Sequence, residues 1–282
     1  MKPKFTFTKM HGLGNDFIVI DGIHQRLEDL DFSKVAPVLC DRHFGIGADG
    51  VILVLNSATS DLKMRIFNAD GSEPEMCGNG VRCFARFVYE NKLIEKEIFS
   101  VETLAGPIVP ALVVQNGIVQ AIEVDMGKPI LAPAEIPVAE FSTNHVINEP
   151  ITIQNEIFNF TAVSMGNPHA VIFVDHLGPI NEIGPAIETH PYFPNKTNVE
   201  FIQVLSRQEI VLKVWERGAG ETLACGTGAC ASVVAGILNQ LLDRKVRVHL
   251  PGGDLNIEWQ QTDEHVIMTG IADVVYTGEI IL

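Results

Sequence analysis

Glu221-Thr-Leu-Ala-Cys225-Gly-Thr-Gly-Ala-Cys230 is the most informative stretch of the chain, because nearly the same sequence occurs a second time, far upstream. The upstream copy is Glu73-Pro-Glu-Met-Cys77-Gly-Asn-Gly. In both copies a glutamate stands four residues before a cysteine, Gly-x-Gly follows the cysteine, and an apolar stretch of helical length comes next. The repetition predicts two similar halves that together form one site.

Each copy is typical of a turn that opens a helix, with the cysteine on the turn. The glycines can take positive φ and let a ligand approach the bare backbone. The first N–H groups of a helix lack intrahelical partners and carry the positive end of the dipole, so they stabilise a thiolate. This placement can lower the pKa of a cysteine well below its usual value of about 8.5. We therefore predict that Cys77 and Cys225 face each other across a bound carboxylate as an acid/base pair.

The other conspicuous residues of these segments are predicted to be structural. Cys83 and Cys230 lie inside the two predicted helices and are expected to be small core residues. Glu73 and Glu221 are expected to serve the first turn or the dipole of their helices. The helix from 229 to 242 is apolar on almost every face until Asn239, which predicts that it is buried on all sides.

Composition limits the class of protein. The 282 residues suit two domains, and 46% hydrophobic residues are ample for two cores. A net charge of −15 argues against nucleic acid or an anionic membrane as a partner. No apolar run approaches the roughly 20 residues that span a bilayer, so a soluble, cytoplasmic protein is expected. The five cysteines form no C-x-x-C pair, which favours reduced thiols and no metal site.

The second half repeats the order of the first. A glycine turn at Met10 to Asn15 precedes the strand 17–20, and Met165-Gly-Asn167-Pro-His169 precedes a second apolar strand. Asn15 stands 62 residues before Cys77, and Asn167 stands 58 before Cys225. The predicted domains are 1–125, possibly joined by a C-terminal strand at 271–282, and 126–270. Helices are predicted at 33–41, 81–93, 180–189 and 229–242, with short strands between them.

This pattern suits one kind of reaction. Inverting the α-carbon of an amino acid needs two bases on opposite faces and donors that hold the charge developing on the carboxylate. Opposed thiols and two helix N-termini would supply both. No lysine lies in a setting that indicates a Schiff base, so a mechanism without a cofactor is predicted.

Four motifs resemble diaminopimelate epimerase from end to end: Met10-His-Gly-Leu-Gly-Asn-Asp-Phe, Asn68-Ala-Asp-Gly-Ser with Cys77-Gly-Asn-Gly-Val-Arg-Cys, Ser164-Met-Gly-Asn-Pro-His, and Glu216-Arg-Gly-Ala-Gly-Glu-Thr-x-Ala-Cys-Gly-Thr-Gly. The resemblance implies interconversion of LL- and meso-diaminopimelate without pyridoxal phosphate, in the bacterial synthesis of lysine and peptidoglycan. It also implies an α/β (α+β) fold of two pseudosymmetric domains, each a β-sheet wrapped around a central helix. The active site would lie in the interdomain cleft.

The resemblance also implies residue roles. Cys77 and Cys225 would transfer protons, and His169 and Glu216 would tune the pKa values of the thiols. Tyr276 would lie at the interface of a homodimer. Some relatives carry glutamine where this chain has Gly50, so a side-chain contact there is in doubt. The implied substrate contacts are Asn15, Asn68, Asn167, Asn198, Glu216 and Arg217, with backbone groups of Gly78-Asn79 and Gly226-Thr227; Arg217 suits a distal carboxylate.

Two alternatives remain open at this point. A related racemase or isomerase acting on another amino or imino acid would share the paired thiols, so discrimination rests on Asn68, Asn198 and Arg217. A non-catalytic thiol protein that binds metal or senses oxidants is the alternative from another class. Two thiols close enough to share one carbon could also form a reversible, inactivating disulfide, which is a hypothesis of its own.

Overall fold

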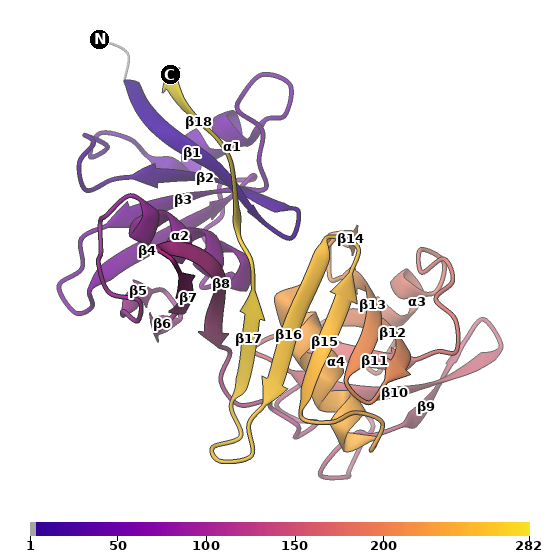
Figure 1. Cartoon of the computed structure of the whole chain (residues 1–282). Helices are drawn as coiled ribbons and strands as arrows, with labels where there is room; N and C mark the ends of the chain where they lie inside the picture. The colour runs from indigo at the N-terminus through magenta and orange to yellow at the C-terminus, as the bar shows by residue number, and fades with distance from the viewer. Residues whose placement is uncertain (1–3) are drawn as a thin grey trace. The chain divides into compact units, whose positions relative to one another are not determined.

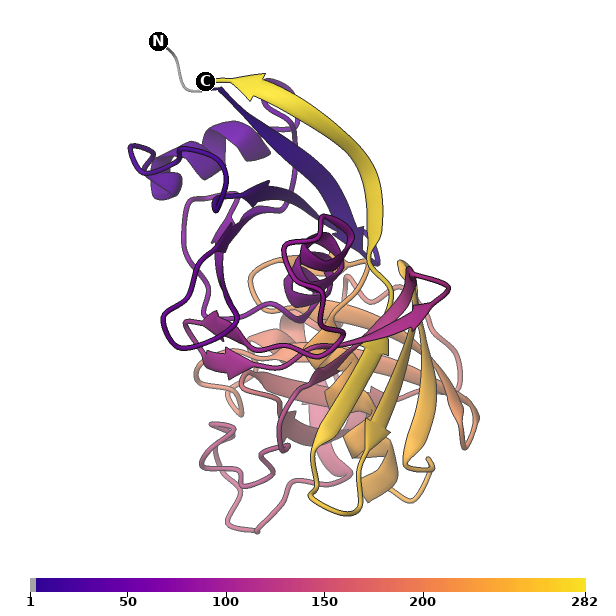
Figure 2. The same cartoon turned by 60° about the vertical axis from the view of Figure 1, so that its left-hand side comes forward.

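A computed structural model describes residues 4–282 and divides into two compact units. Unit 1 comprises residues 4–124 and Thr269–Leu282, and unit 2 comprises Asp125–Met268. The last strand, β18 (Asp273–Ile281), belongs to unit 1 because it pairs antiparallel with β1 (Lys4–Gly12), beside which it runs in Figures 1 and 2. Among the described residues, no helix is both long and apolar enough to span a bilayer.

Unit 1 is a seven-stranded sheet curved around one buried helix. The strand order is β18-β1-β2-β3-β4-β5-β6, and α2 (Gly78–Glu90) contacts β1, β2 and β3. Figure 2 shows α2 inside the curve of these strands. Phe84 and Val88 of α2 are fully buried, so the apolar stripe of the helix forms the core. The remaining elements are β2 (Asn15–Asp21), α1 (Phe32–Cys40), β3 (Gly50–Leu55), β4 (Leu62–Asn68), β5 (Val101–Thr103), β6 (Gly106–Ile108), β7 (Ala111–Gln115) and β8 (Ile118–Asp125).

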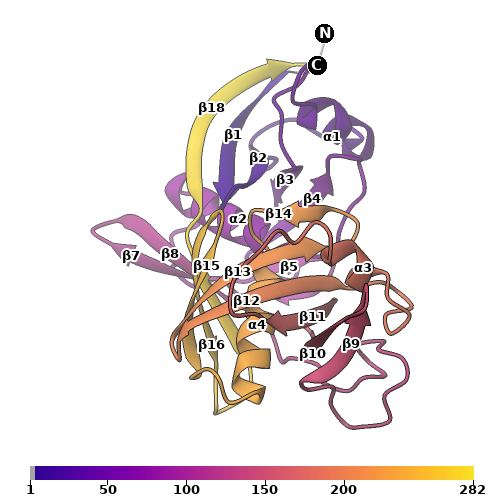
Figure 3. The ribbon, with the colours of Figure 1, turned by 90° about the vertical axis from the view of Figure 1, so that its right-hand side faces the viewer.

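Unit 2 has the same plan around α4 (Gly226–Leu238). The strand order is β17-β16-β15-β13-β12-β11-β10-β9, with β14 paired to β13. The helix contacts β10, β11, β12 and β16, and Figure 3 shows it against these strands. Residues 228–236 of α4 are all buried, which confirms the prediction from its apolar composition. The other elements are β9 (Glu149–Ile153), β10 (Glu156–Ser164), β11 (Pro168–Phe173), α3 (Gly184–Glu188), β12 (Asn198–Ser206), β13 (Glu209–Glu216), β14 (Gly220–Thr222), β15 (Lys245–Leu250), β16 (Gly253–Trp259) and β17 (Val266–Gly270).

The two units are pseudosymmetric because the same series of antiparallel and parallel strand pairs occurs in each. In unit 1, β1 pairs antiparallel with β2, β2 parallel with β3, and β3 antiparallel with β4. In unit 2, β10 pairs antiparallel with β11, β11 parallel with β12, and β12 antiparallel with β13. The strands β4 and β13 then lead to the two cysteine turns. The predicted fold class is confirmed.

One prediction about the helices was wrong. The helix expected over 180–189 is the single turn α3, because Pro185 lacks an N–H and fits only the first turn of a helix. A Cβ on the neighbouring Gly184 would lie 2.7 Å from the Trp215 ring, so this turn packs closely on β13. The side chain of Arg82 on α2 is fully buried.

Candidate active site

Both cysteines cap their helices in the same way. Cys77 is the N-cap of α2, and Sγ accepts a hydrogen bond from the Gly80 N–H at 3.4 Å. Cys225 is the N-cap of α4, and Sγ accepts from the Gly228 N–H at 3.3 Å. Both have extended backbone, with φ −145° and −126°. The prediction that each cysteine opens a helix is confirmed, and each sulfur lies where a helix N-terminus favours negative charge.

The surroundings of Cys77 are amides. The side-chain oxygen of Asn15 lies 3.8 Å from Sγ and accepts a hydrogen bond from the Asn79 amide at 3.1 Å. Asn15 is the first residue of β2, directly after a tight turn in which Gly14 has φ 88°. The predicted contacts Asn15, Gly78 and Asn79 therefore gather around Cys77.

The surroundings of Cys225 are buried and acidic. Cys225 is 6% exposed, and Thr227 Oγ1 lies 3.4 Å from Sγ. Burial raises the pKa of the Cys225 thiol well above its usual value, and the nearby carboxylates of Glu216 and Glu200 raise it further. The expected lowering of the pKa by the helix N-terminus is therefore wrong for Cys225. Loss of hydration and two negative neighbours outweigh the hydrogen bond from Gly228.

His169 lies beside these groups in a buried ion pair. Its Nδ1 is 2.7 Å from Glu200 Oε1, both side chains are fully buried, and Nε2 is 3.0 Å from the Asn167 side-chain oxygen. Burial raises the pKa of Glu200. A Cβ at position 228 would lie 2.7 Å from Glu200 Oε1, so the second glycine of this motif makes room for the carboxylate.

Glu216 ends β13 and faces the same thiol. Thr222 Oγ1 donates to Glu216 Oε1 at 2.5 Å, and the Cys225 side chain also hydrogen-bonds to this carboxylate. Burial raises the pKa of Glu216. A buried carboxyl group with a raised pKa, hydrogen-bonded to the thiol, suits a residue that tunes that thiol.

Asn198 fixes the backbone next to Glu216. Its side-chain oxygen accepts from the Arg217 N–H at 2.9 Å, and its amide donates to the Pro168 carbonyl at 2.8 Å. Arg217 itself is exposed, and one guanidinium nitrogen donates to the Asn195 carbonyl at 3.2 Å. The remaining donors of this guanidinium can meet an anionic ligand.

Asn68 and Gly50 lie opposite each other in the sheet of unit 1. Asn68 is exposed at the end of β4 and donates to Ser72 Oγ at 2.9 Å. A Cβ at position 50 would lie 2.7 Å from the Phe67 carbonyl oxygen and 3.3 Å from the Phe17 ring. Position 50 thus has no room for a side chain here, and any ligand contact at this point is made by the backbone.

The two motif glutamates do not serve their helices. Glu73 forms a bidentate salt bridge with Arg65, whose guanidinium donates to the two carboxylate oxygens at 2.8 and 2.7 Å. Glu221 is exposed on β14, opposite Trp215. The first turn of either helix contains no acidic residue. The four-residue offset places each glutamate before the turn that delivers the cysteine, so the prediction was wrong for both.

Sequence reasoning missed two carboxylates at the site. Asp49 hydrogen-bonds to Asn15 at 2.8 Å, and Glu200 pairs with His169. The sequence could have indicated both. Asp49 ends the glycine-rich turn before β3. Glu200 is a charged residue in a buried strand, two positions after Asn198 and therefore on the same face of the sheet. Among residues 4–282, no cluster of three or more His, Cys, Asp or Glu is arranged to hold a metal ion.

Comparison with solved structures identifies the fold. The whole chain aligns with a PhzF-family phenazine biosynthesis protein from Bacillus anthracis, at a TM-score of 0.72 and 17% identity over 100% of both chains. It aligns equally well with a hydroxyproline epimerase from Agrobacterium vitis, at a TM-score of 0.72 and 15% identity, covering 100% of this chain and 94% of that one. At such identities the likeness concerns the fold alone.

Comparison with other sequences is far more specific. The profile of the family "Diaminopimelate epimerase" matches residues 7–132 and 161–275. The diaminopimelate epimerase of Halothermothrix orenii is 57% identical over 284 residues, covering 99% of each chain. That of Methanococcus maripaludis is 51% identical over 277 residues, covering 97% of this chain and 99% of its own. By profile and by identity, this chain belongs to the diaminopimelate epimerase family.

Proposed function

We propose that this protein epimerises LL-diaminopimelate to meso-diaminopimelate without a cofactor, in the synthesis of lysine and peptidoglycan precursors. Curated relatives that are 50–57% identical over nearly their full length carry the name of this activity, which supports the proposal. Asn68, Asn198 and Arg217, on which discrimination from related racemases rests, are all present in this chain.

The proposed mechanism uses Cys77 and Cys225 on opposite faces of the α-carbon of the substrate. One thiolate removes the α-proton and becomes a thiol, leaving the electron pair delocalised into the carboxylate. The other thiol then gives its proton to the opposite face and becomes a thiolate. The enzyme ends with its protons exchanged between the two sulfurs, and the reverse reaction restores them.

One observation carries this proposal: the same cysteine cap occurs on α2 and on α4, 148 residues apart. Both Gly-x-Gly turns present first-turn N–H groups, which can stabilise the negative charge that develops on the reacting carboxylate. We propose backbone contacts from Gly78-Asn79 and Gly226-Thr227. Side-chain contacts would come from Asn15, Asn68, Asn167, Asn198 and Arg217, with His169 and Glu216 tuning Cys225.

Glu216 would act in a second way, through hydrogen bonding to the substrate's ammonium groups. Its carboxylate is fixed by Thr222, so it can accept an N–H without reorganising. This geometry supports both the contact and the tuning role that the family motif implies.

We further propose a cytoplasmic homodimer that does not bind nucleic acid. A net charge of −15 supports the last point. The edge strand β18 exposes Tyr276, Val274, Val275 and Ile281, and an unpaired strand edge that carries apolar side chains can pair with a second copy. Light scattering on the purified protein tests the dimer, and a monomer at micromolar concentration would refute it.

The test of the activity is the conversion of LL-diaminopimelate by purified protein, followed by chiral separation, with no cofactor added. We expect the LL and meso isomers to approach equilibrium. Proline and hydroxyproline serve as competing substrates. If proline or hydroxyproline is racemised and diaminopimelate is not converted, the proposed substrate is wrong, although the two-thiol mechanism still stands.

A further inference from the structure

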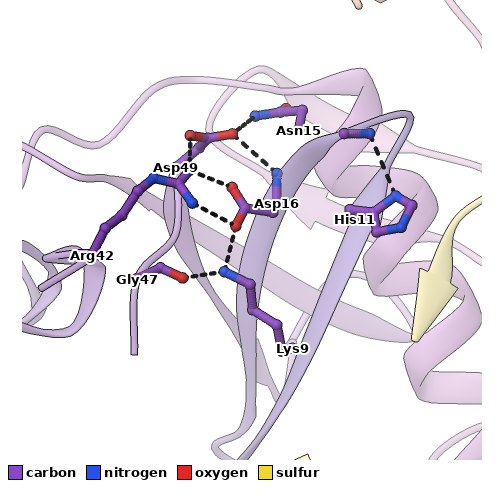
Figure 4. A network of polar contacts seen from close by, with 8 residues as sticks. Lys9, His11, Asn15, Asp16, Arg42, Gly47 and Asp49 are labelled. Atoms are coloured by element: carbon purple, nitrogen blue, oxygen red, sulfur yellow. Dashed lines mark hydrogen bonds and ion pairs between the residues drawn. The ribbon is translucent and has the colours of Figure 1, made fainter. Parts of the chain in front are cut away.

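Asp49 lies in a polar network with Asn15, Asp16, Arg42 and Lys9 (Figure 4). Its Oδ2 accepts from the Asn15 side-chain amide at 2.8 Å and from the Asp16 N–H at 3.0 Å. Its Oδ1 accepts from Arg42 at 2.8 Å. A carboxylate can only accept hydrogen bonds when ionised, so the group of Asn15 that faces Asp49 must be the NH₂.

The far end of the same chain of amides is fixed by a donor. The buried guanidinium of Arg82 donates to the Asn79 side-chain oxygen at 2.9 Å, and the Asn79 NH₂ donates to the Asn15 oxygen at 3.1 Å. A guanidinium can only donate. Asp49 therefore fixes the orientation of the Asn15 amide, and Arg82 fixes that of the Asn79 amide. The two orientations are compatible, because they place the Asn79 NH₂ against the Asn15 oxygen.

This orientation determines what Asn15 offers to the reaction site. Its NH₂ is occupied by Asp49, and its oxygen lies 3.8 Å from Cys77 Sγ. An amide oxygen accepts from a thiol S–H or from an ammonium N–H, and repels a carboxylate. A reversed amide would present N–H groups at the same point and have the opposite preferences.

The rest of the network holds Asp49 in place. Arg42 bridges Asp49 and Asp16, with contacts to Asp16 at 2.8 and 3.2 Å. Lys9 pairs with Asp16 and also donates to the Gly47 carbonyl, on the turn that leads to Asp49. Burial alone would raise the pKa of Asp16, but Arg42 and Lys9 outweigh it and lower the pKa to about 2.

We propose that Asp49 is a positioning residue for the epimerase reaction: it holds the Asn15 amide with its oxygen toward Cys77 and toward the ammonium group of the bound substrate. The contact between the Asn15 oxygen and the substrate ammonium group rests on the proposed function, whereas the orientation of that oxygen toward Cys77 does not. The Asp16 carboxylate belongs to the same network, but its hydrogen bonds there go to Arg42 and Lys9 and not to the Asn15 amide. A change at Asp16 is therefore a matched control for a change at Asp49.

The experiment compares Asp49→Asn, Asp49→Ala and Asp16→Asn with the wild-type protein. Asp49 is 42% exposed, and Arg42 keeps its contacts with Asp16 when Asp49 is changed, so both position-49 variants are expected to fold. Without the carboxylate, only the Asn79 NH₂ still favours the present orientation of the Asn15 amide, so a fraction of the molecules turns the Asn15 NH₂ toward the sulfur. A donor favours the thiolate, which is the species that iodoacetamide alkylates.

We expect alkylation of Cys77 at pH 8, resolved by peptide mass spectrometry, to be about fivefold faster in both position-49 variants. The kcat/KM for diaminopimelate should fall about tenfold in the same two variants. Asp16→Asn should lower the Tm more than Asp49→Asn, yet leave the alkylation rate of Cys77 close to that of the wild type.

A double variant distinguishes orientation from structural damage. Asn15→Asp combined with Asp49→Asn places a carboxylate at position 15, and both of its oxygens are acceptors. An acceptor then faces Cys77 in either orientation. We expect its alkylation rate to return to the wild-type rate or below, and part of the lost kcat/KM to recover.

Wild-type alkylation rates in both position-49 variants would overturn the proposal. So would equal acceleration in Asp16→Asn, because it would indicate general loosening of the turn. A wild-type protein that fails to epimerise diaminopimelate would refute the proposed function instead, and the alkylation rates would still decide the orientation of Asn15.

Discussion

The Cys77 and Cys225 turns have one backbone geometry and two electrostatic settings. Both sulfurs cap a helix and accept an N–H from the third residue onward, at 3.4 and 3.3 Å. Cys77 is half-buried among amides, whereas Cys225 is buried beside two carboxylates and a histidine. The comparison teaches that the helix N-terminus alone does not determine the protonation of a thiol. Desolvation and neighbouring charge determine it here.

The largest effect on the rate of epimerisation is expected when either thiol is removed. Cys77→Ala and Cys225→Ala should each lower kcat for epimerisation by about three orders of magnitude, because in the proposed mechanism each thiol transfers the proton on one face. The measurement is the initial rate from both LL- and meso-diaminopimelate. Cys83→Ala and Cys230→Ala, at buried core positions, are the controls; a single catalytic cysteine variant with near wild-type rates in both directions would exclude the pair.

The next largest effect is expected at Arg217, which distinguishes substrate binding from thiol chemistry. Arg217→Ala should raise the KM for diaminopimelate roughly 10- to 100-fold, with a smaller change in kcat, because a charged hydrogen-bond partner is lost. Arg207→Ala is the matched control, since Arg207 is an exposed arginine of unit 2 paired with Asp243. Unchanged KM for Arg217→Ala would argue against a distal carboxylate as its ligand.

Glu200→Gln sharpens the difference between the two settings. The change removes one of the negative charges that raise the pKa of Cys225, so alkylation of Cys225 at pH 9 should become about tenfold faster. It also weakens the buried hydrogen bond between position 200 and His169, which should cost roughly 2 kcal/mol of stability. Glu258→Gln, an exposed member of an ion pair with Lys245, is the control. An unchanged rate at Cys225 would mean that burial and Glu216 raise its pKa without a contribution from Glu200.

The smallest effect expected is an opposite pH dependence of the two units. Asp16 has a pKa lowered to about 2, so its stabilisation is present above pH ~4 and is lost as the pH falls toward 2; it amounts to roughly 2 kcal/mol. Cys225 has a raised pKa, so the folded state loses stability as the pH rises above about 8.5.

Denaturant unfolding from pH 2 to 10 measures this dependence, and hydrogen exchange assigns each loss to its unit. Asp16→Asn should flatten the acid limb, and Cys225→Ala should flatten the alkaline limb. An acid limb that is unchanged in Asp16→Asn would show that other carboxylates dominate.

Local patterns predicted the two helix caps well, because a cysteine followed by Gly-x-Gly and an apolar stretch of helical length specifies the start of a helix within a few residues. They could not predict the contact between Asp49 and Asn15, since 34 residues separate them and the contact depends on the parallel pairing of β2 and β3. The pairing of Glu200 with His169 likewise depends on the register of β11 and β12, in which His169 faces Asn198. The wrong expectation for the Cys225 pKa has the same origin, because burial is a property of the packed unit.

The most direct test of the two-thiol proposal uses LL-diaminopimelate carrying deuterium at the α-carbons, in ordinary water. If one sulfur removes the deuteron and the other delivers its own proton, the first meso product will carry hydrogen at the inverted centre. The unreacted LL substrate will still carry deuterium. Early meso product that retains deuterium at the inverted centre would mean that one group carries the same hydron across, and would contradict the assignment of Cys77 and Cys225 to opposite faces.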